Sequence, residues 1–269
     1  MPSAVAPPDP SVAGQHALEV RRVVRHVRAA AAAGAAAGCL ALQWLGRSYG
    51  ATRAERRRRL PGDDLMAAPM AVTTHAITID TPPDRIWPWL VQMGWHRGAW
   101  YTAEWVDRLL FPANGPSADR IIPELQNLAV GDHIPDGPPE AKCEFIVAQL
   151  EPDRHLVLHS ADHLPPGWKE RFGAWIDWTW AFVLDDLGDG KTRFIFRSRG
   201  RAGPWWVAAA YLLAVIPADF VMSRQMLRGV KTRAERAMAA DLHAADSAER
   251  GRPARSRAGQ RSRSGRPGR

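Results

Sequence analysis

VTTHAITIDTPPDRIWPWLVQMG, residues 72–94, is the stretch of sequence that decides the fold. Its first part is rich in β-branched side chains and alternates imperfectly in polarity, which predicts a half-buried β-strand. Thr81 is placed to cap a helix, Pro82 suits the first helical turn, and Asp84 lies where a capping box has its acid. Apolar and aromatic side chains follow, and Pro88 is expected to bend the helix. The stretch therefore predicts a strand that leads directly into a short aromatic helix.

The next segment predicts a second short helix and a long connection. Residues 102–110 have helical spacing and are expected to present Trp105, Leu109 and Leu110 to the core. Residues 111–135 are expected to be mostly loop, with a strand beginning at His133.

A run of β-strands follows, and its pattern indicates an antiparallel sheet. Residues 175–184 alternate between large apolar and smaller side chains, and Asp189-Gly190 is a strong hairpin signal. The returning strand places aromatic side chains on one side and arginines on the other, which predicts a sheet with one face in water. Strands are predicted at residues 142–150, 155–160, 175–184 and 192–199.

Two apolar helical segments close the body of the chain. Residues 204–216 are strongly apolar but short for a membrane span, so a core or interfacial helix is expected. Pro217 is expected to interrupt it. Residues 218–242 then predict a long helix with its apolar residues clustered in the first half.

The net charge of +8 is unevenly distributed along the 269 residues. Residues 250–269 contain eight arginines and no acid, and residues 1–60 contain ten arginines and three acids, so residues 61–249 have a net charge of −7. An acidic body with basic ends does not indicate a nucleic-acid-binding domain. Cys39 and Cys143 form no disulfide or metal-binding pattern, which permits a reducing compartment.

The N-terminal region combines a basic segment with an apolar one. Four arginines lie between Arg21 and Arg28, and residues 29–45 are almost wholly apolar but rich in alanine. Three interpretations stay open: a membrane anchor or peripheral membrane helix, a soluble helix packed on the body, and a cleaved export signal. The anchor is favoured, with the main domain on the cytoplasmic side because the export signals are poor.

The order of elements resembles the helix-grip arrangement of the START-like (SRPBCC) superfamily, in an uncharacterised bacterial branch. That superfamily includes polyketide cyclases, plant allergen-type lipid carriers and coenzyme Q-binding proteins. The resemblance covers residues 60–238 and is of α+β class, with an antiparallel sheet wrapped around a long C-terminal helix. It is carried by ITIDTPPDRIWPWLVQMG (77–94), SADRIIPELQNLAVGD (117–132), WAFVLDDLGDGKTRFIFRSR (180–199) and DFVMSRQMLRGVKTRAE (219–235).

The resemblance implies a deep cavity between the sheet and the long helix that holds a hydrophobic or amphipathic ligand. Aromatic walls with a few polar groups are usual in such sites. The alternative is that the same side chains simply fill a core. The expected ligand-binding residues are Trp178, Trp180, Phe182, Phe194 and Phe196, closed by Phe220, Met222 and Met226.

The candidate acid–base groups near the cavity mouth are weaker predictions, because each of these residues could equally be structural. In a cyclase or dehydratase, His96 or His159 could be the base, and Tyr101 or Arg197 could donate to a developing enolate oxygen. No nucleophile elbow, phosphate-binding glycine loop or His-x-x-x-His pair is present, so no metal and no cofactor are expected. The further candidates are Glu104, Asp119, Glu124 and Asp177.

The leading hypothesis is a membrane-associated binding protein for a lipid-like or polyketide-like molecule, and a cyclase or dehydratase on the same fold is the alternative. A third hypothesis is an interaction protein that uses its Arg-rich tail. The tail lacks interleaved aromatics, so contact with nucleic acid would be nonspecific, and an anionic membrane surface fits equally well. The expected organisation is disorder at 1–16, the basic and apolar helix at 17–48, a linker at 49–69, the helix-grip domain at 70–242 and a disordered tail at 243–269.

Overall fold

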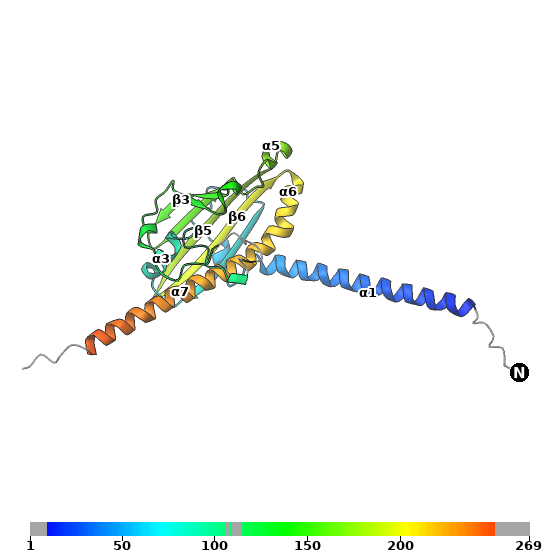
Figure 1. Ribbon diagram of the computed structural model, residues 1–269, viewed down its shortest axis with the longest axis horizontal. Coiled ribbons are helices and arrows are strands. Elements are labelled where there is room, and N and C mark those ends of the chain that lie inside the picture. The colour runs from blue at the N-terminus through cyan, green and yellow to red at the C-terminus, as the bar shows by residue number, and fades with distance from the viewer. Residues whose placement is uncertain (1–9, 106–107, 109–114, 251–269) are drawn as a thin grey trace, which may run out of the picture.

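A six-stranded antiparallel sheet with a long helix across one face forms the body of the protein, in a computed structural model that describes residues 10–105, 108 and 115–250 (Figure 1). The strand order is β1-β6-β5-β4-β3-β2. This arrangement confirms the predicted α+β class and the helix-grip fold. The strands are β1 (Ala71–Ile79), β2 (His133–Pro135), β3 (Glu144–Glu151), β4 (His155–Ser160), β5 (Trp175–Gly188) and β6 (Lys191–Gly203).

The helical elements lie around this sheet. The helices are α1 (Pro10–Leu45), α2 (Arg53–Arg57), α3 (Pro83–Val91), α5 (Trp168–Phe172), α6 (Trp205–Ala210) and α7 (Ile216–Arg250). Single 3-10 turns occur at Pro123–Leu125 and Pro139–Ala141, and a π-helical turn, Tyr211–Val215, joins α6 to α7. The helical path therefore runs without a break from Trp205 to Arg250, and α7 itself begins at Ile216, close to the predicted start at residue 218. Pro217 does not interrupt it, because proline is tolerated in a first helical turn and the π-helical turn precedes it.

The start of α3 differs from the predicted capping box. The helix begins at Pro83, and the N-cap position is Pro82, which has no side-chain cap. The Thr81 hydroxyl is buried without a hydrogen-bond partner in the described part of the chain, while its carbonyl accepts a 2.7 Å hydrogen bond from the Thr192 hydroxyl. The cap prediction was wrong because Thr81 is held against β6 instead of turning toward the helix. Pro88 lies inside α3, as predicted.

The second predicted short helix is described only in part. Glu104, Trp105 and Arg108 are helical, while Leu109 and Leu110 lie outside the described residues. Trp105 is 55% exposed, so its predicted place in the core was wrong.

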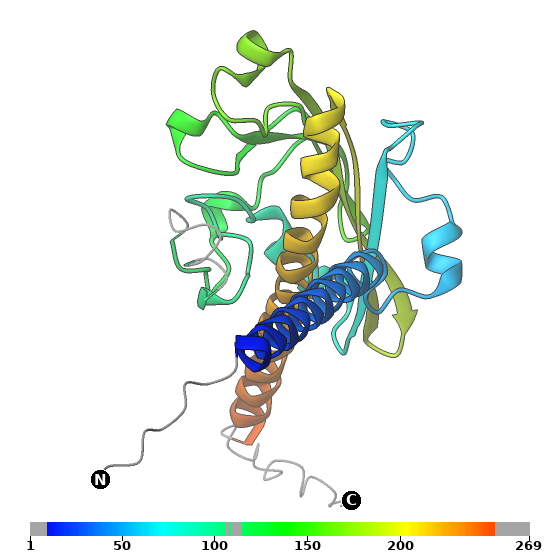
Figure 2. The ribbon, with the colours of Figure 1, turned by 90° about the vertical axis from the view of Figure 1, so that its right-hand side faces the viewer.

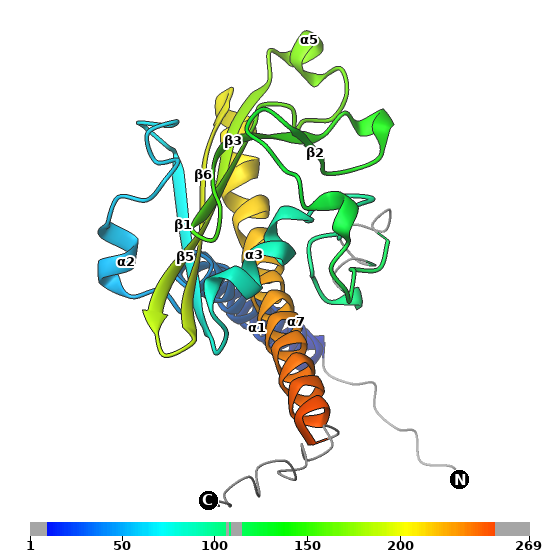
Figure 3. The ribbon, with the colours of Figure 1, turned by 90° about the vertical axis from the view of Figure 1, so that its left-hand side faces the viewer.

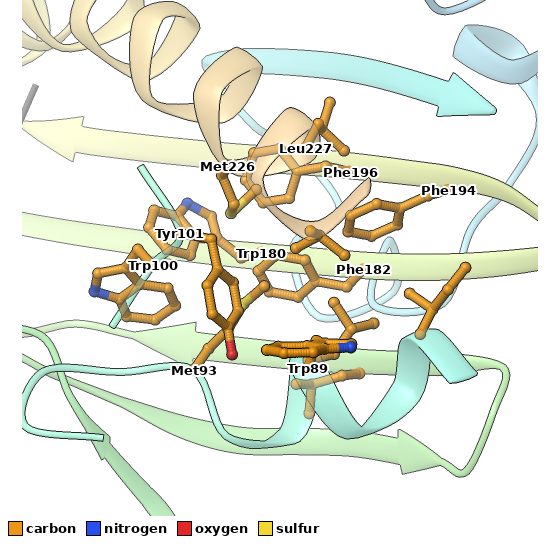
Figure 4. Close-up of a cluster of buried hydrophobic side chains, with 14 of the residues drawn as sticks. Trp89, Met93, Trp100, Tyr101, Trp180, Phe182, Phe194, Phe196, Met226 and Leu227 are labelled. Carbon is orange, nitrogen blue, oxygen red and sulfur yellow. The ribbon is translucent and has the colours of Figure 1, made fainter. Parts of the chain in front are cut away.

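The main core fills the space between the sheet, α3 and α7. Phe182, Phe194 and Phe196 from the central strands are fully buried there, together with Leu227 and Val230 of α7 (Figure 4). The predicted apolar face of β5 is therefore the inner face of the sheet.

The opposite face of the sheet is covered over part of β1, β5 and β6, while Ile146 of β3 and Arg201 of β6 are exposed. Residues 47–66 pack across it, and Leu60 joins Ala76, Val183 and Ile195 in a second buried cluster. Figure 3 shows α2 and α7 on opposite sides of the sheet. The predicted linker at residues 49–69 is thus part of the domain.

Arginines hold this outer layer in place. Arg197 is 2% exposed at its side chain, and its Nη1 atom lies 2.7 Å from Asp63 Oδ2. Arg193 pairs with Glu55 at 2.7 Å and lowers the pKa of that carboxyl to about 2. A guanidinium can be buried when carboxylates and backbone carbonyls take its donors, which is why an arginine-rich face is not a solvated one here.

Helix α1 projects away from the body (Figures 1 and 2). Its residues 21–41 are exposed, so that stretch is not packed on the body. Near its end, the Gln43 side chain donates a hydrogen bond to the Leu212 carbonyl. Residues 10–16 and 243–250 are helical rather than disordered, and residues 1–9 and 251–269 lie outside the described part of the chain.

One helical stretch of the described residues, Trp205–Ala248, is long and apolar enough to cross a membrane. Its most apolar part is 28% buried. Length and composition alone do not separate a membrane span from a core helix, and α7 packs on the sheet. The predicted anchor at residues 29–45 does not meet the same criterion among the described residues.

Candidate functional site

A cavity of about 500 Å³ opens between the end of the sheet and the start of α7. This volume is within the range of sites for small organic molecules. Its walls come from strand β5, from the loops that flank β3 and β4, and from the π-helical turn and α7. The lining residues are Asp136, Ala141, Cys143, His163, Leu164, Pro165, Pro166, Trp178, Trp180, Ala214, Val215, Ala218, Asp219 and Met222.

One face of the C-terminal helix forms the cavity wall opposite the strand. Val215, Ala218, Asp219 and Met222 line the cavity at positions i, i+3, i+4 and i+7, which places them on one side of the helix. Three of the four are apolar, so the carboxyl of Asp219 is the polar group of this wall. Further along α7, Met226 packs in the main core.

Two tryptophans of β5 form the aromatic wall. The rings of Trp178 and Trp180 meet edge to face, with centroids 5.4 Å apart. Trp178 donates a 2.6 Å hydrogen bond from Nε1 to the Ser198 hydroxyl, which fixes its ring. Trp180 Nε1 is buried without a hydrogen-bond partner among the described residues. A buried unsatisfied donor is costly, and a ligand acceptor could satisfy it.

Asp219 is the most unusual polar group of the cavity. Its side chain is buried, and it accepts hydrogen bonds of 3.3 Å from the hydroxyls of Thr73 and Ser223. Burial raises its pKa from 3.8 to about 7, because desolvation disfavours the carboxylate and two hydroxyl donors only partly compensate. No lysine or arginine of the described residues lines the cavity. The carboxyl therefore faces an aromatic space without a cationic partner.

The loop wall carries a second set of polar groups. His163 Nε2 lies 2.8 Å from Asp136 Oδ2, and its Nδ1 lies 2.7 Å from the Ser160 hydroxyl. The ring of His163 also packs on Phe145 and Trp178. Cys143 lines the same cavity, and burial raises the pKa of its thiol. His163 is thus held at both nitrogens, and its Asp136 partner is already paired.

The interior closes beyond Trp180. A void of about 10 Å³, bounded by Trp100, Phe196 and Met226, adjoins the cavity on the side of the core. Phe182 and Phe194 lie past this point and make contacts only within the packed core (Figure 4). The cavity is therefore confined to one end of the inner face.

Some of the predicted ligand-binding residues line the cavity, and the others lie in the packed core or elsewhere. Trp178, Trp180 and Met222 line the cavity. Phe196 and Met226 bound only the small void, and Phe182 and Phe194 are core. Phe220 points elsewhere, packing on Tyr49 and His75 with ring centroids 6.0 and 6.2 Å away.

The predicted acid–base residues do not assemble into a site. His96 is exposed at a loop with a positive φ of 55° and packs on Trp95. The Tyr101 side chain is buried and accepts a 2.8 Å hydrogen bond from Gln92, and burial raises its pKa. His159 lies on the outer face, where it binds Asp177 at 2.7 Å. None of them lines the cavity.

The remaining candidates have structural partners or exposed positions. Arg197 is on the outer face, bound to Asp63, and so cannot donate to a ligand in the cavity. Glu104 pairs with Arg108, and Asp177 also binds Arg201 at 2.7 Å. Asp119 and Glu124 are exposed and do not line the cavity.

Sequence reasoning missed Asp219, His163 and Asp136. A signal existed for Asp219, because an acid spaced at helical intervals between Val215, Ala218 and Met222 lies on an apolar helix face. His163 and Asp136 come from loops 27 residues apart. Only the folded sheet brings these two loops together.

A larger groove of about 860 Å³ lies at the hairpin end of the sheet. Its walls are charged, and several of these charges are already paired, such as Arg154 with Glu151 at 2.8 Å and Arg58 with Asp185. Paired surface charges are screened by water and leave little for a ligand to gain. The smaller aromatic cavity is the better candidate.

No protein-family model and no curated protein matches the chain. Similar solved structures include a hypothetical protein from Helicobacter pylori (12% identity, 65% of this chain and 95% of that chain, TM-score 0.40). Norcoclaurine synthase from Thalictrum flavum (14%, 62% and 92%, TM-score 0.31) and a polyketide-cyclase-like protein from Corynebacterium glutamicum (15%, 67% and 94%, TM-score 0.27) are also similar. At such low TM-scores these likenesses say nothing about ligand or reaction, and the helix-grip description rests on the topology.

Proposed function

We propose that this protein binds a hydrophobic small molecule, of lipid-like or polyketide-like character, in the cavity between β5 and α7. The proposal rests on one observation: the inner face of the sheet is closely packed at one end, and at the other end, the hollow end, it borders a cavity. Folding normally closes such a space, because unfilled apolar volume costs stability. A cavity of about 500 Å³ lined by Trp178, Trp180 and Met222 is therefore best explained by a ligand that fills it.

The test uses a neutral hydrophobic probe, N-phenyl-1-naphthylamine, whose fluorescence rises in apolar surroundings. The full-length protein is expected to bind the probe at one site. Ala218→Phe places a large side chain into the cavity from α7 and is expected to abolish binding. Ala240→Phe is the matched control, because Ala240 is exposed further along the same helix. Equal binding by the two variants would contradict the proposal, as would the absence of binding to the unchanged protein.

A cyclase or dehydratase stays the alternative function, but on other residues than those predicted. Asp219 and the Asp136–His163 pair line one cavity, so an acid and a base are available to the same bound molecule. A carboxyl whose pKa lies near neutrality suits proton transfer. Turnover would distinguish this alternative from carriage: a carrier returns the co-purified ligand unchanged after prolonged incubation.

We further propose that the protein associates with a membrane. The exposed α1 supplies one contact, with arginines beside an apolar stretch. A second lies at the aromatic tip, which we define as Trp168, Phe172, Trp175, Trp205 and Trp206. Trp205 is 80% exposed, and Lys169 and Arg171 lie among these rings. Tryptophan and basic side chains favour the lipid–water interface.

The aromatic tip is next to the cavity mouth, since Leu164 to Pro166 line the cavity two residues before α5 begins. Hydrogen exchange of the full-length chain with phosphatidylcholine vesicles, with and without phosphatidylglycerol, tests both contacts locally. Protection is expected in α1 and in residues 165–175 and 203–213, stronger with the anionic lipid. No change in either region would contradict membrane association.

A further inference from the structure

The charge of the cavity wall restricts the chemistry of the ligand. The ionisable side chains that line it are Asp136, Cys143, His163 and Asp219, and no lysine or arginine of the described residues is among them. Asp136 has His163 as its partner at 2.8 Å. Asp219 has only the hydroxyls of Thr73 and Ser223, each at 3.3 Å. The carboxyl of Asp219 is thus the group whose charge nothing in the cavity neutralises.

The surroundings of Asp219 would suit a positive charge in two ways. A cation beside the carboxyl would form an ion pair in a space of low polarity, where such attraction is stronger than in water. Trp178 and Trp180 line the same cavity, and the face of an aromatic ring attracts a cation through its quadrupole. The carboxylate would repel an anion, and a neutral ligand would leave the carboxylate without a counter-charge.

We propose that the ligand is a hydrophobic amine, whose ammonium group binds Asp219 while its apolar body fills the aromatic part of the cavity. This inference rests on the proposed function and narrows it to one class of ligand. The rest of the wall fits an apolar body, because Leu164, Pro165, Val215 and Met222 present only hydrocarbon and thioether surface. A ligand of this class neutralises the one unpaired carboxyl of the cavity on binding.

The unpaired carboxyl also explains why Asp219 is kept in an apolar helix face. A buried acid costs stability, and the two hydroxyl hydrogen bonds from Thr73 and Ser223 offset that cost only in part. Met226, Leu227 and Val230 continue the same helix into the core with apolar side chains alone. The carboxyl is thus a feature of the hollow end, where the cavity is, and not of the packed end.

Three probes with the same naphthyl body and different charge test the inference on the full-length protein. They are 2-naphthylmethylamine, 2-naphthylmethanol and 2-naphthoate, each measured by displacement of N-phenyl-1-naphthylamine. The amine is expected to bind about tenfold or more tightly than the alcohol, and the carboxylate most weakly. Because this series uses the unchanged protein, it tests the preference for an amine even if a variant does not fold.

Three variants locate the preference. Asp219→Asn keeps the shape and the hydroxyl contacts but removes the charge, so the amine is expected to bind no better than the alcohol. Asp136→Asn removes the other carboxylate of the wall and tests whether the preference arises there, while Asp241→Asn, at an exposed position of α7 outside the cavity, is the matched control and is expected to keep the preference for the amine. Loss of the preference in Asp136→Asn alone would overturn the assignment to Asp219.

The outcomes separate this inference from the proposed function. If the alcohol binds as tightly as the amine and Ala218→Phe blocks both, the cavity binds hydrophobic molecules and the amine inference is wrong. Tightest binding of the carboxylate would also overturn the inference. If the fluorescent probe itself does not bind, the proposed function fails.

Discussion

The two ends of the inner face of the sheet differ although the same strands build both. At one end, Phe182 and Phe194 meet Leu227 and Val230 of α7 and leave no space. At the other end, Trp178 and Met222 face each other across a cavity of about 500 Å³. The sequence alternates in the same way along β5 at both ends, so the alternation alone does not tell a core from a site.

The difference comes from what lies above each end. The packed end is covered by the regular part of α7, with large apolar side chains at helical spacing. The hollow end is covered by the π-helical turn and the first turn of α7, which present Ala214, Val215 and Ala218. Small side chains above two tryptophans leave the space, and π-helical turns are frequent at functional sites.

The largest expected effect is at the packed end. Phe182→Ala removes a fully buried ring and should lower the free energy of unfolding by about 3–5 kcal/mol. Probe binding by the folded fraction should stay unchanged, because Phe182 does not line the cavity. Urea unfolding followed by circular dichroism measures the free energy of unfolding, and titration with the probe in the absence of urea measures binding. A loss below about 1 kcal/mol would mean that this end is not a packed core.

The next effect concerns the outer face, where Arg197 uses all its donors. Nε binds the Thr74 hydroxyl at 3.1 Å, Nη1 binds the Arg58 carbonyl and Asp63, and Nη2 binds the carbonyls of Glu55 and Arg56. Arg197→Met keeps the volume but leaves these acceptors unpaired, so a loss of about 3 kcal/mol is expected.

Hydrogen exchange should locate that loss in residues 47–66, which the guanidinium ties to the sheet. Arg201→Met on the same strand is the control, because Arg201 is exposed and should cost less than about 1 kcal/mol. If residues 47–66 keep their protection in Arg197→Met, the arginine does not hold this layer.

Two buried groups with opposite pKa shifts give a third prediction. Burial lowers the pKa of His75 from 6.5 to about 4, so the unfolded chain takes up this proton first and stability falls as the pH drops from 6.5 to 4. Burial raises the pKa of Asp219 to about 7, so the folded protein takes up that proton first and stability rises as the pH drops from 7 to 4. The two effects have similar size, roughly 3 kcal/mol at full extent, and oppose each other.

Between pH 7 and pH 5 the unchanged protein should therefore show little change in stability from this pair of residues. His75→Phe removes the acid-labile member and should make the variant gain about 1–2 kcal/mol over that interval relative to the unchanged protein. Chemical unfolding at both pH values measures the difference. An identical pH dependence in both proteins would show that His75 does not stay neutral in the fold.

The fold could be predicted from the sequence because its signals are local. The predicted strand 155–160 coincides with β4, and the Asp189-Gly190 turn joins β5 to β6 as expected. The helix-grip arrangement followed from the order of such elements. Boundaries failed where tertiary contacts override local signals, as at Thr81, which is held against Thr192 of β6.

The site could be predicted only in part, for physical reasons. Trp178, Trp180 and Met222 were found because they lie on an inward face, but the same rule also selected Phe182 and Phe194, which are core. The arginines on one face of β6 predicted that this face is exposed to water. In the structure, groups from residues 55–66 pair with these arginines and cover them. Pairing between distant segments, as between His163 and Asp136, has no signature along the chain.

The smallest expected effect on stability is at the hollow end. Met222 is an inward-facing apolar side chain like Phe182, but one side of it borders empty space and it is only half-buried. Met222→Ala therefore removes fewer contacts and should lower the free energy of unfolding by about 1 kcal/mol or less. The affinity for the probe should change more than the stability does. It should fall several-fold, because the probe loses contact with one wall of its site. Met238→Ala, on a half-buried position of the same helix away from the cavity, controls for a general effect on α7.

The ratio of the change in stability to the change in probe affinity distinguishes the packed end of the inner face from the hollow end. Phe182→Ala should change stability and leave affinity unchanged, whereas Met222→Ala should change affinity and have little effect on stability. Equal ratios in the two variants would mean that the inner face is one continuous core and that the cavity does not exist in solution.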